Sequence, residues 1–226
     1  MIDTQAIEKA KHIAVIVDEK SFAHGSAIYS YLLQLHKKVT LVSEVPLAKK
    51  LSCLAWYKDV RNALPQGAEY VLKVECEALE LYHYLQNCGA KINEKIAQAL
   101  YVALFMERNL FAPSLEQERV AVASQLLEVA CEAPACFNQV VRTRSLAELR
   151  LKAKLLQRAV LRADATQAWV EICEDDFKQT ATQHKDIMVC VEDLFCLPYV
   201  QEVIFTDSQT KQKIKTVIKE DFEKKK

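Results

Sequence analysis

Residues 12–35 read HIAVIVDEKSFAHGSAIYSYLLQL, and this stretch determines the fold class. Its first part, His12–Val17, is an apolar run rich in β-branched residues, which is typical of a buried strand. From Gly25 to Leu35 the apolar side chains recur at helical spacing, at positions 27, 28, 31, 32 and 35. The stretch therefore predicts a strand followed by a helix.

Two further strands are predicted after this unit, at Val39–Val42 and Tyr70–Val74. The segments between the strands are long enough for helices, which favours a parallel sheet built of βαβ units. Beyond the third strand the pattern becomes almost purely helical, with predicted helices at Ile92–Met106, at Leu115–Ala130 after an N-cap at Ser114, and from Pro134 onward. We therefore predict an α/β domain over residues 1–144, with a parallel sheet and a layer of helices.

The segment Ser145–Arg162 has an amphipathic pattern, with Leu146, Leu149, Ala153, Leu156 and Val160 on one face. It predicts a linker helix over residues 145–163. The remaining residues, 164–226, alternate between strand and helix patterns and predict a small α+β lobe. Its expected elements are strands at Ala168–Cys173, Val200–Thr206 and Lys213–Ile218 and a helix at Lys185–Leu194.

Charge and composition exclude several functions. Thirty basic and thirty acidic side chains cancel, so the molecule has no overall field to attract duplex nucleic acid. The chain contains three glycines, at positions 25, 67 and 89, which are too few and too scattered for a glycine-rich phosphate loop. No window reaches the roughly 20 apolar residues of a membrane span. We expect no membrane association.

The N-terminal segment MIDTQAIEKAKH is charged and lacks the apolar core of a signal peptide, so the expected location is the cytoplasm. The eight cysteines include no Cys-x-x-Cys pair and mostly lie among apolar neighbours. We therefore predict reduced, buried thiols.

The order of these segments resembles that of the DHH/DHHA1 phosphoesterase family, which includes nanoRNase/pAp phosphatases and RecJ-like exonucleases. In that family the first strand leads into His-x-x-Pro-Asp-x-Asp-Ala-x-Gly-Ser, whose His and two Asp bind manganese. The corresponding residues here run from Lys20 to Ser30. The resemblance places Lys20 at the His position, His24 at the first Asp and Ser26 at the second.

Ile92–Phe111 is similar to the family helix that ends in Asp-Thr-Gly-x-Phe, and here that motif is replaced by Glu-Arg-Asn-Leu-Phe at positions 107–111. The resemblance makes Glu75 and Glu107 the other ligand positions. Two family elements are missing from the sequence. No His-His pair occurs and 17 residues, 75–91, separate the third strand from the next helix, so the Asp-His-His element is expected to be absent. The Gly-Gly-Gly-His loop would follow Lys213–Ile218 and is expected to be absent too.

These losses predict a DHH-like protein that is non-catalytic, has no cofactor and binds a protein partner or a second copy of itself. One alternative is a manganese-dependent phosphoesterase or short-oligoribonuclease of the pAp phosphatase type, acting on a nucleotide or short oligonucleotide. Its rebuilt site would use Asp18, His24, Glu75 and Glu107. Another is a nucleotide-binding regulator, with a phosphate held at the helix N-terminus near His24-Gly25-Ser26.

Overall fold

The computed structural model describes residues 2–107 and 117–224, and it divides the chain into two compact units, Met1–Thr143 and Arg144–Lys226. Within the described residues, the first unit contains three parallel strands in the order β2-β1-β3. The central strand β1 (His12–Ile16) pairs with β2 (Lys38–Val42) and β3 (Tyr70–Lys73). The predicted parallel sheet is therefore present.

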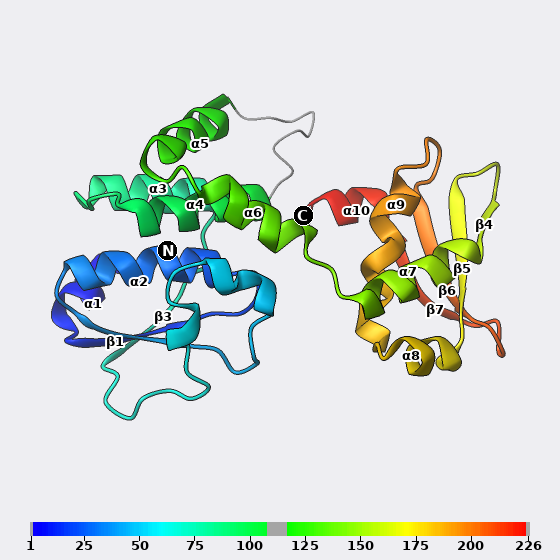
Figure 1. Ribbon diagram of the computed structural model, residues 1–226, viewed down its shortest axis with the longest axis horizontal. Helices are drawn as coiled ribbons and strands as arrows, with labels where there is room; N and C mark the ends of the chain where they lie inside the picture. The colour runs from blue at the N-terminus through cyan, green and yellow to red at the C-terminus, as the bar shows by residue number, and fades with distance from the viewer. Residues whose placement is uncertain (1, 108–116, 225–226) are drawn as a thin grey trace. The chain divides into compact units, whose positions relative to one another are not determined.

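Helix α2 (Phe22–Gln34) lies between this sheet and α4 (Glu94–Glu107), as Figure 1 shows. Its side chains from Phe22 to Ile28 are all buried, because one face meets the sheet and the other meets α4. Gly25 allows this close approach, since a Cβ atom there would lie 2.2 Å from Cγ1 of Val17. Two more helices, α5 (Gln117–Val129) and α6 (Ala133–Arg142), pack on α4.

Shorter elements complete the first unit. They are helix α1 (Thr4–Lys9), the 3-10 turns η1 (Lys49–Cys53) and η2 (Tyr57–Asp59), and helix α3 (Ala78–Asn87). The predicted N-cap at Ser114 lies outside the described residues. A disulfide joins Cys53 of η1 to Cys136 of α6, so the prediction of reduced thiols is wrong for this pair. The two residues are 83 positions apart and meet because α6 packs on η1, which local spacing does not reveal.

The thiols of the other cysteines are not uniformly buried either. Cys131 and Cys196 are exposed and Cys190 is buried, while the remaining free cysteines are intermediate. Burial raises the pKa of the Cys190 thiol to about 11. A thiol in this surrounding is a poor nucleophile at neutral pH.

The second unit contains, among its described residues, a mixed sheet of four strands in the order β4-β5-β6-β7. The strands are β4 (Ala159–Arg162), β5 (Gln167–Ile172), β6 (Glu202–Asp207) and β7 (Lys213–Ile218). Its helical elements are α7 (Leu146–Gln157), α8 (Glu174–Thr180), η3 (His184–Cys190), α9 (Val191–Phe195) and α10 (Lys219–Lys224). The predicted helix at Lys185–Leu194 is therefore a 3-10 turn followed by a short α-helix.

Helix α7 differs from its prediction in length and in orientation. It ends at Gln157, and Ala159–Arg162 forms a strand that pairs with β5 in an antiparallel hairpin. The hairpin turn, residues 163–165, has positive φ angles, and the strand pairing outweighs the helical pattern of the preceding residues. The buried face of α7 carries Leu151 and Leu155, whereas Leu146 is 62% exposed. The predicted apolar face was wrong because α7 is apolar on two sides, and periodicity alone does not choose between them.

Helix α7 packs against α8, η3 and β5, so it lies within the second unit. In residues 2–107 and 117–224, no single helix has the length and apolar content needed to cross a membrane. Taken together, α5 and α6 would reach that length, but they meet at a bend of 116°.

Candidate functional site

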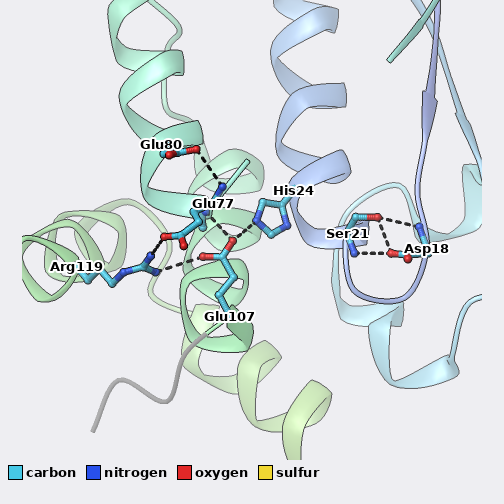
Figure 2. A network of polar contacts seen from close by, with 8 residues as sticks. Asp18, Ser21, His24, Glu77, Glu80, Glu107 and Arg119 are labelled. Carbon is cyan, nitrogen blue, oxygen red and sulfur yellow. Dashed lines mark hydrogen bonds and ion pairs between the residues drawn. The ribbon is translucent and has the colours of Figure 1, made fainter. Parts of the chain in front are cut away.

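A polar network forms where α2, α3, α4 and α5 meet at one of their ends (Figure 2). Its centre is Glu107, the last residue of α4. Oε1 of Glu107 is 2.6 Å from Nε2 of His24 and accepts a hydrogen bond of 2.7 Å from the backbone N–H of Ala78. Oε2 accepts a hydrogen bond of 3.3 Å from Nη1 of Arg119. The same guanidinium forms an ion pair with Glu77 through its Nη2. Protein donors therefore engage both oxygens of Glu107.

Burial makes this network energetically important. Arg119 is 2% exposed, and a guanidinium removed from water needs paired carboxylates to offset its lost hydration. The side chain of Glu107 is 20% exposed, whereas that of Glu77 is 49% exposed. Screening by water therefore weakens the pair of Arg119 with Glu77 more than its pair with Glu107.

His24 lies in the first turn of α2 and is buried, with 6% exposure. Its Nδ1 has no hydrogen-bond partner among the described residues. When the ring hydrogen is on Nε2, this atom donates to Glu107 and Nδ1 remains an acceptor, so no buried N–H lacks a partner. The contact with Glu107 therefore fixes both the orientation and the tautomer of the ring.

Glu107 also supports the start of α3. The Ala78 N–H that it accepts belongs to the first residue of that helix, and a carboxylate is favoured at a helix N-terminus by the backbone dipoles. Beside it, the backbone N–H of Glu77 donates to Glu80 at 3.4 Å. Glu107 is thus bonded to α2, α3 and α5 at once.

Asp18 makes a separate set of contacts at the start of α2, away from this network in Figure 2. Its Oδ1 accepts hydrogen bonds from the Lys20 N–H, the Ser21 N–H and the Ser21 hydroxyl at 3.0, 2.8 and 2.7 Å. The Ser21 hydroxyl bond is the main cause that lowers the pKa of Asp18, and with the backbone bonds it outweighs the opposite effect of burial. The backbone N–H groups of Lys20 and Ser21, just before α2, therefore have an anion of the chain as their partner.

Lys20, Ser26 and Glu75, the other residues placed by sequence, make no hydrogen bond or ion pair with Glu107. Lys20 is exposed. Ser26 is fully buried and its hydroxyl donates to the carbonyl of Ala55 at 3.0 Å. Glu75 is exposed and makes no hydrogen bond or ion pair with the part of the chain that the structure describes. Of the four metal-ligand candidates, the structure brings His24 and Glu107 together and leaves Asp18 and Glu75 outside. Residues 108–111 of the replaced motif lie outside the described residues.

These side chains do not fit a two-manganese centre. Such a centre needs several carboxylates and imidazoles around two ions, with a bridging ligand. Among residues 2–107 and 117–224, no three His, Cys, Asp or Glu side chains are grouped so that they could hold a metal ion. The oxygens of Glu107 already accept hydrogen bonds from protein donors, one of them a cation.

Glu77 and Arg119 are members of the network that sequence reasoning missed. Glu77 could have been noticed, because Glu77-x-x-Glu80 before an apolar run resembles a capping box with an unusual N-cap residue. Arg119 carries no local signal. Its burial depends on the packing of α5 against α4, which brings together residues 12 positions apart.

The comparisons with known proteins support the fold. No protein-family model and no curated protein sequence matches the chain. Among solved structures, an exopolyphosphatase-related protein from Bacteroides fragilis matches with a TM-score of 0.73 at 14% identity, covering 93% of this chain and 79% of its own. A putative family II inorganic pyrophosphatase from Methanococcus jannaschii matches at 14% identity with a TM-score of 0.32, covering 87% of this chain and 83% of its own.

The second likeness is too distant to support an argument. The first shows that the chain shares the α/β fold of that exopolyphosphatase-related protein. The predicted fold class is therefore confirmed. At this level of identity the likeness concerns the fold alone, and the chemistry must be argued from the site.

Proposed function

We propose that this protein uses a DHH-type phosphoesterase fold for a non-catalytic role in binding, assembly or regulation. The observation that carries the proposal is the state of Glu107, whose carboxylate accepts hydrogen bonds from the Ala78 N–H and the Arg119 guanidinium. A carboxylate bound in this way is poorly suited to hold a metal ion. Without a metal, the fold lacks the group that would activate water and stabilise the charge on a phosphoryl oxygen.

The positions of Lys20 and Ser26 support the same proposal. Ser26 is turned into the core toward Ala55, and Lys20 brings positive charge to the position where the resemblance expects a ligand. Neither residue can replace a lost carboxylate or imidazole. The partner would be another protein or a second copy of the chain. The cytoplasmic location and the lack of a cofactor also remain predictions.

The test is a hydrolysis assay on purified protein with manganese, using pAp and oligonucleotides of two to four residues as substrates. An active DHH-type phosphoesterase should be assayed in parallel to show that the conditions support catalysis. We expect no activity above that of the Glu107→Ala variant. Manganese-dependent hydrolysis that Glu107→Ala abolishes would contradict the proposal.

A metal-dependent phosphoesterase is the second candidate, and one observation favours it. His24 contacts a carboxylate through Nε2 and leaves Nδ1 without a partner among the described residues, which is how metal-binding histidines are often oriented. This candidate predicts a stoichiometric metal ion in the purified protein, which His24→Ala should remove. If elemental analysis of the native protein finds no metal and added manganese leaves the melting temperature unchanged, this candidate is rejected.

A further inference from the structure

We propose that the Cys53–Cys136 disulfide is a reversible redox switch, which holds η1 against α6 when it is oxidised and loosens η1 when it is reduced. The two states differ by two electrons and two protons. The switch acts on the conformation of the first unit, so it goes beyond the proposed function and operates whether or not the protein hydrolyses phosphoesters.

The other cysteines set this disulfide apart from the rest of the chain. The six remaining cysteines are free thiols, and two of them, Cys131 and Cys196, are exposed. Exposed cysteines are usually paired in chains that fold in an oxidising compartment, whereas a disulfide in reducing surroundings is usually transient or redox-sensing. Cys131 lies five positions before Cys136 in the sequence and is unpaired, so the fold selects the partner of Cys136.

Besides the disulfide, one exposed polar side chain of α6 bonds to η1. Nε2 of Gln139 donates hydrogen bonds of 3.2 Å to the carbonyl of Lys50 and to the hydroxyl of Ser52. Such bonds from an exposed side chain contribute little to stability, because water can replace them. Leu51 and Leu54 are buried in the core, and they keep the unit folded when the disulfide opens. Reduction therefore loosens η1 without unfolding the domain.

The segment that follows Cys53 bonds directly to α2. The carbonyl of Ala55 accepts a hydrogen bond of 3.0 Å from the Ser26 hydroxyl, and the indole N–H of Trp56 donates to the Ser30 hydroxyl at 2.8 Å. Trp56 has a φ angle of 68°, a backbone conformation that bulky side chains rarely adopt, so the surrounding contacts must hold it in place. The redox state of Cys53 is thereby coupled to the contacts of α2.

An external thiol opens the switch. Cys53 is partly exposed and Cys136 is 4% exposed, so a reducing thiolate reaches the Sγ atom of Cys53 first. Its attack forms a mixed disulfide with Cys53 and releases the thiolate of Cys136, which takes up a proton. A second thiol of the reductant then breaks the mixed disulfide, which leaves both cysteines as thiols and the reductant as a disulfide. Oxidised glutathione closes the switch again and is itself reduced to two glutathione thiols.

The experiment measures hydrogen exchange in full-length wild type by mass spectrometry, after treatment with oxidised glutathione or with dithiothreitol under native conditions. Alkylation in denaturant after an acid quench counts the thiols of each state. The N–H groups of Leu51, Leu54 and Asp59 donate to carbonyls within residues 48–59, so their exchange reports local opening. We expect two more thiols after reduction and exchange over residues 48–59 that is about tenfold faster.

Strand β1 is the internal reference, and it should stay protected over the same labelling time in both states. Cys53→Ser/Cys136→Ser should exchange like reduced wild type under both treatments. Cys131→Ser is the matched control, because it removes a nearby thiol and keeps the pair, and it should respond like wild type. The main comparison uses wild-type protein, so it stands even if the double variant does not fold.

A disulfide that does not form with oxidised glutathione overturns the proposal, as does one that dithiothreitol reduces only in denaturant. Equal exchange over residues 48–59 in the two states also overturns it. Loss of protection in β1 together with residues 48–59 overturns it as well, because the disulfide would then hold the whole unit together. Hydrolysis in the phosphoesterase assay bears on the proposed function alone, so the two proposals can fail separately.

Discussion

Replacing Glu107 by alanine should strongly destabilise the first unit, although Glu107 lies at a helix end. The change removes the acceptor of the Ala78 N–H and of the His24 Nε2 atom, and it takes one carboxylate away from the Arg119 guanidinium. An unpaired amide at a partly exposed helix start costs about 1 kcal/mol. A buried guanidinium that loses a carboxylate partner costs about 3 kcal/mol. We therefore expect a loss of about 4 kcal/mol, a large fraction of the stability of an ordinary domain.

Urea unfolding followed by tryptophan fluorescence measures this loss. Trp56 belongs to the first unit and Trp169 to the second, so a Trp169→Phe background makes the signal specific for the first unit. Glu128→Ala is the control, because Glu128 is an exposed glutamate near the end of α5, and it should change stability by less than about 0.5 kcal/mol. A Glu107→Ala protein within about 1 kcal/mol of wild type would refute the argument that this network is buried and mutually satisfied.

Three further predictions follow from local geometry. Gly25→Ala should lower the free energy of unfolding in urea by about 3 kcal/mol, because its Cβ would lie 2.2 Å from a core side chain. Gly67→Ala is the control and should be nearly neutral, because the atom nearest to its Cβ is 3.9 Å away. Equal losses of stability in the two variants would contradict the packing of Gly25. Asp18→Ala should cost about 1 kcal/mol at pH 7. The pKa of Asp18 is lowered in the folded state, so its contribution to stability is complete above the pKa of the unfolded chain, near 4, and is lost as the pH falls through the pKa of the folded state. A stability difference between wild type and Asp18→Ala that does not change with pH would contradict this. The double change Cys53→Ser/Cys136→Ser should lower the free energy of unfolding by about 4 kcal/mol, because the disulfide closes a loop between residues 83 positions apart. If the wild-type protein unfolds at the same midpoint with and without a thiol reductant, the disulfide is not present in solution.

The fold could be predicted from sequence where local pattern and tertiary packing agree. Strand β1 and helix α2 are such a case, since the apolar run from His12 and the helical spacing after Gly25 both match the buried surfaces of the structure. Prediction failed for the segment from Leu146 to Arg162 because it carries two apolar faces and ends in strand-forming residues. Only the pairing of β4 with β5 decides that the chain turns back there.

The site could be predicted in part. His24 and Glu107 were named from the resemblance, and they meet although they are 83 positions apart. Asp18 and Glu75 do not join them, because the carboxylate of Asp18 is bonded to the first turn of α2 and Glu75 is exposed. Arg119 was invisible in the sequence. An arginine among the polar residues of a helix looks solvent-exposed, and its burial follows from the packing of α5 on α4.

The charges of this region are satisfied by the chain itself in two separate places. At the start of α2 the anion is Asp18, which accepts hydrogen bonds from the backbone N–H groups of Lys20 and Ser21. At the end of α4 the cation is Arg119, which binds carboxylates that a metal ion would need. An active site keeps such groups partly unsatisfied until a ligand arrives, and that costs stability. Here both sets of groups stabilise the fold, so substitutions at Glu107 should lower the free energy of unfolding.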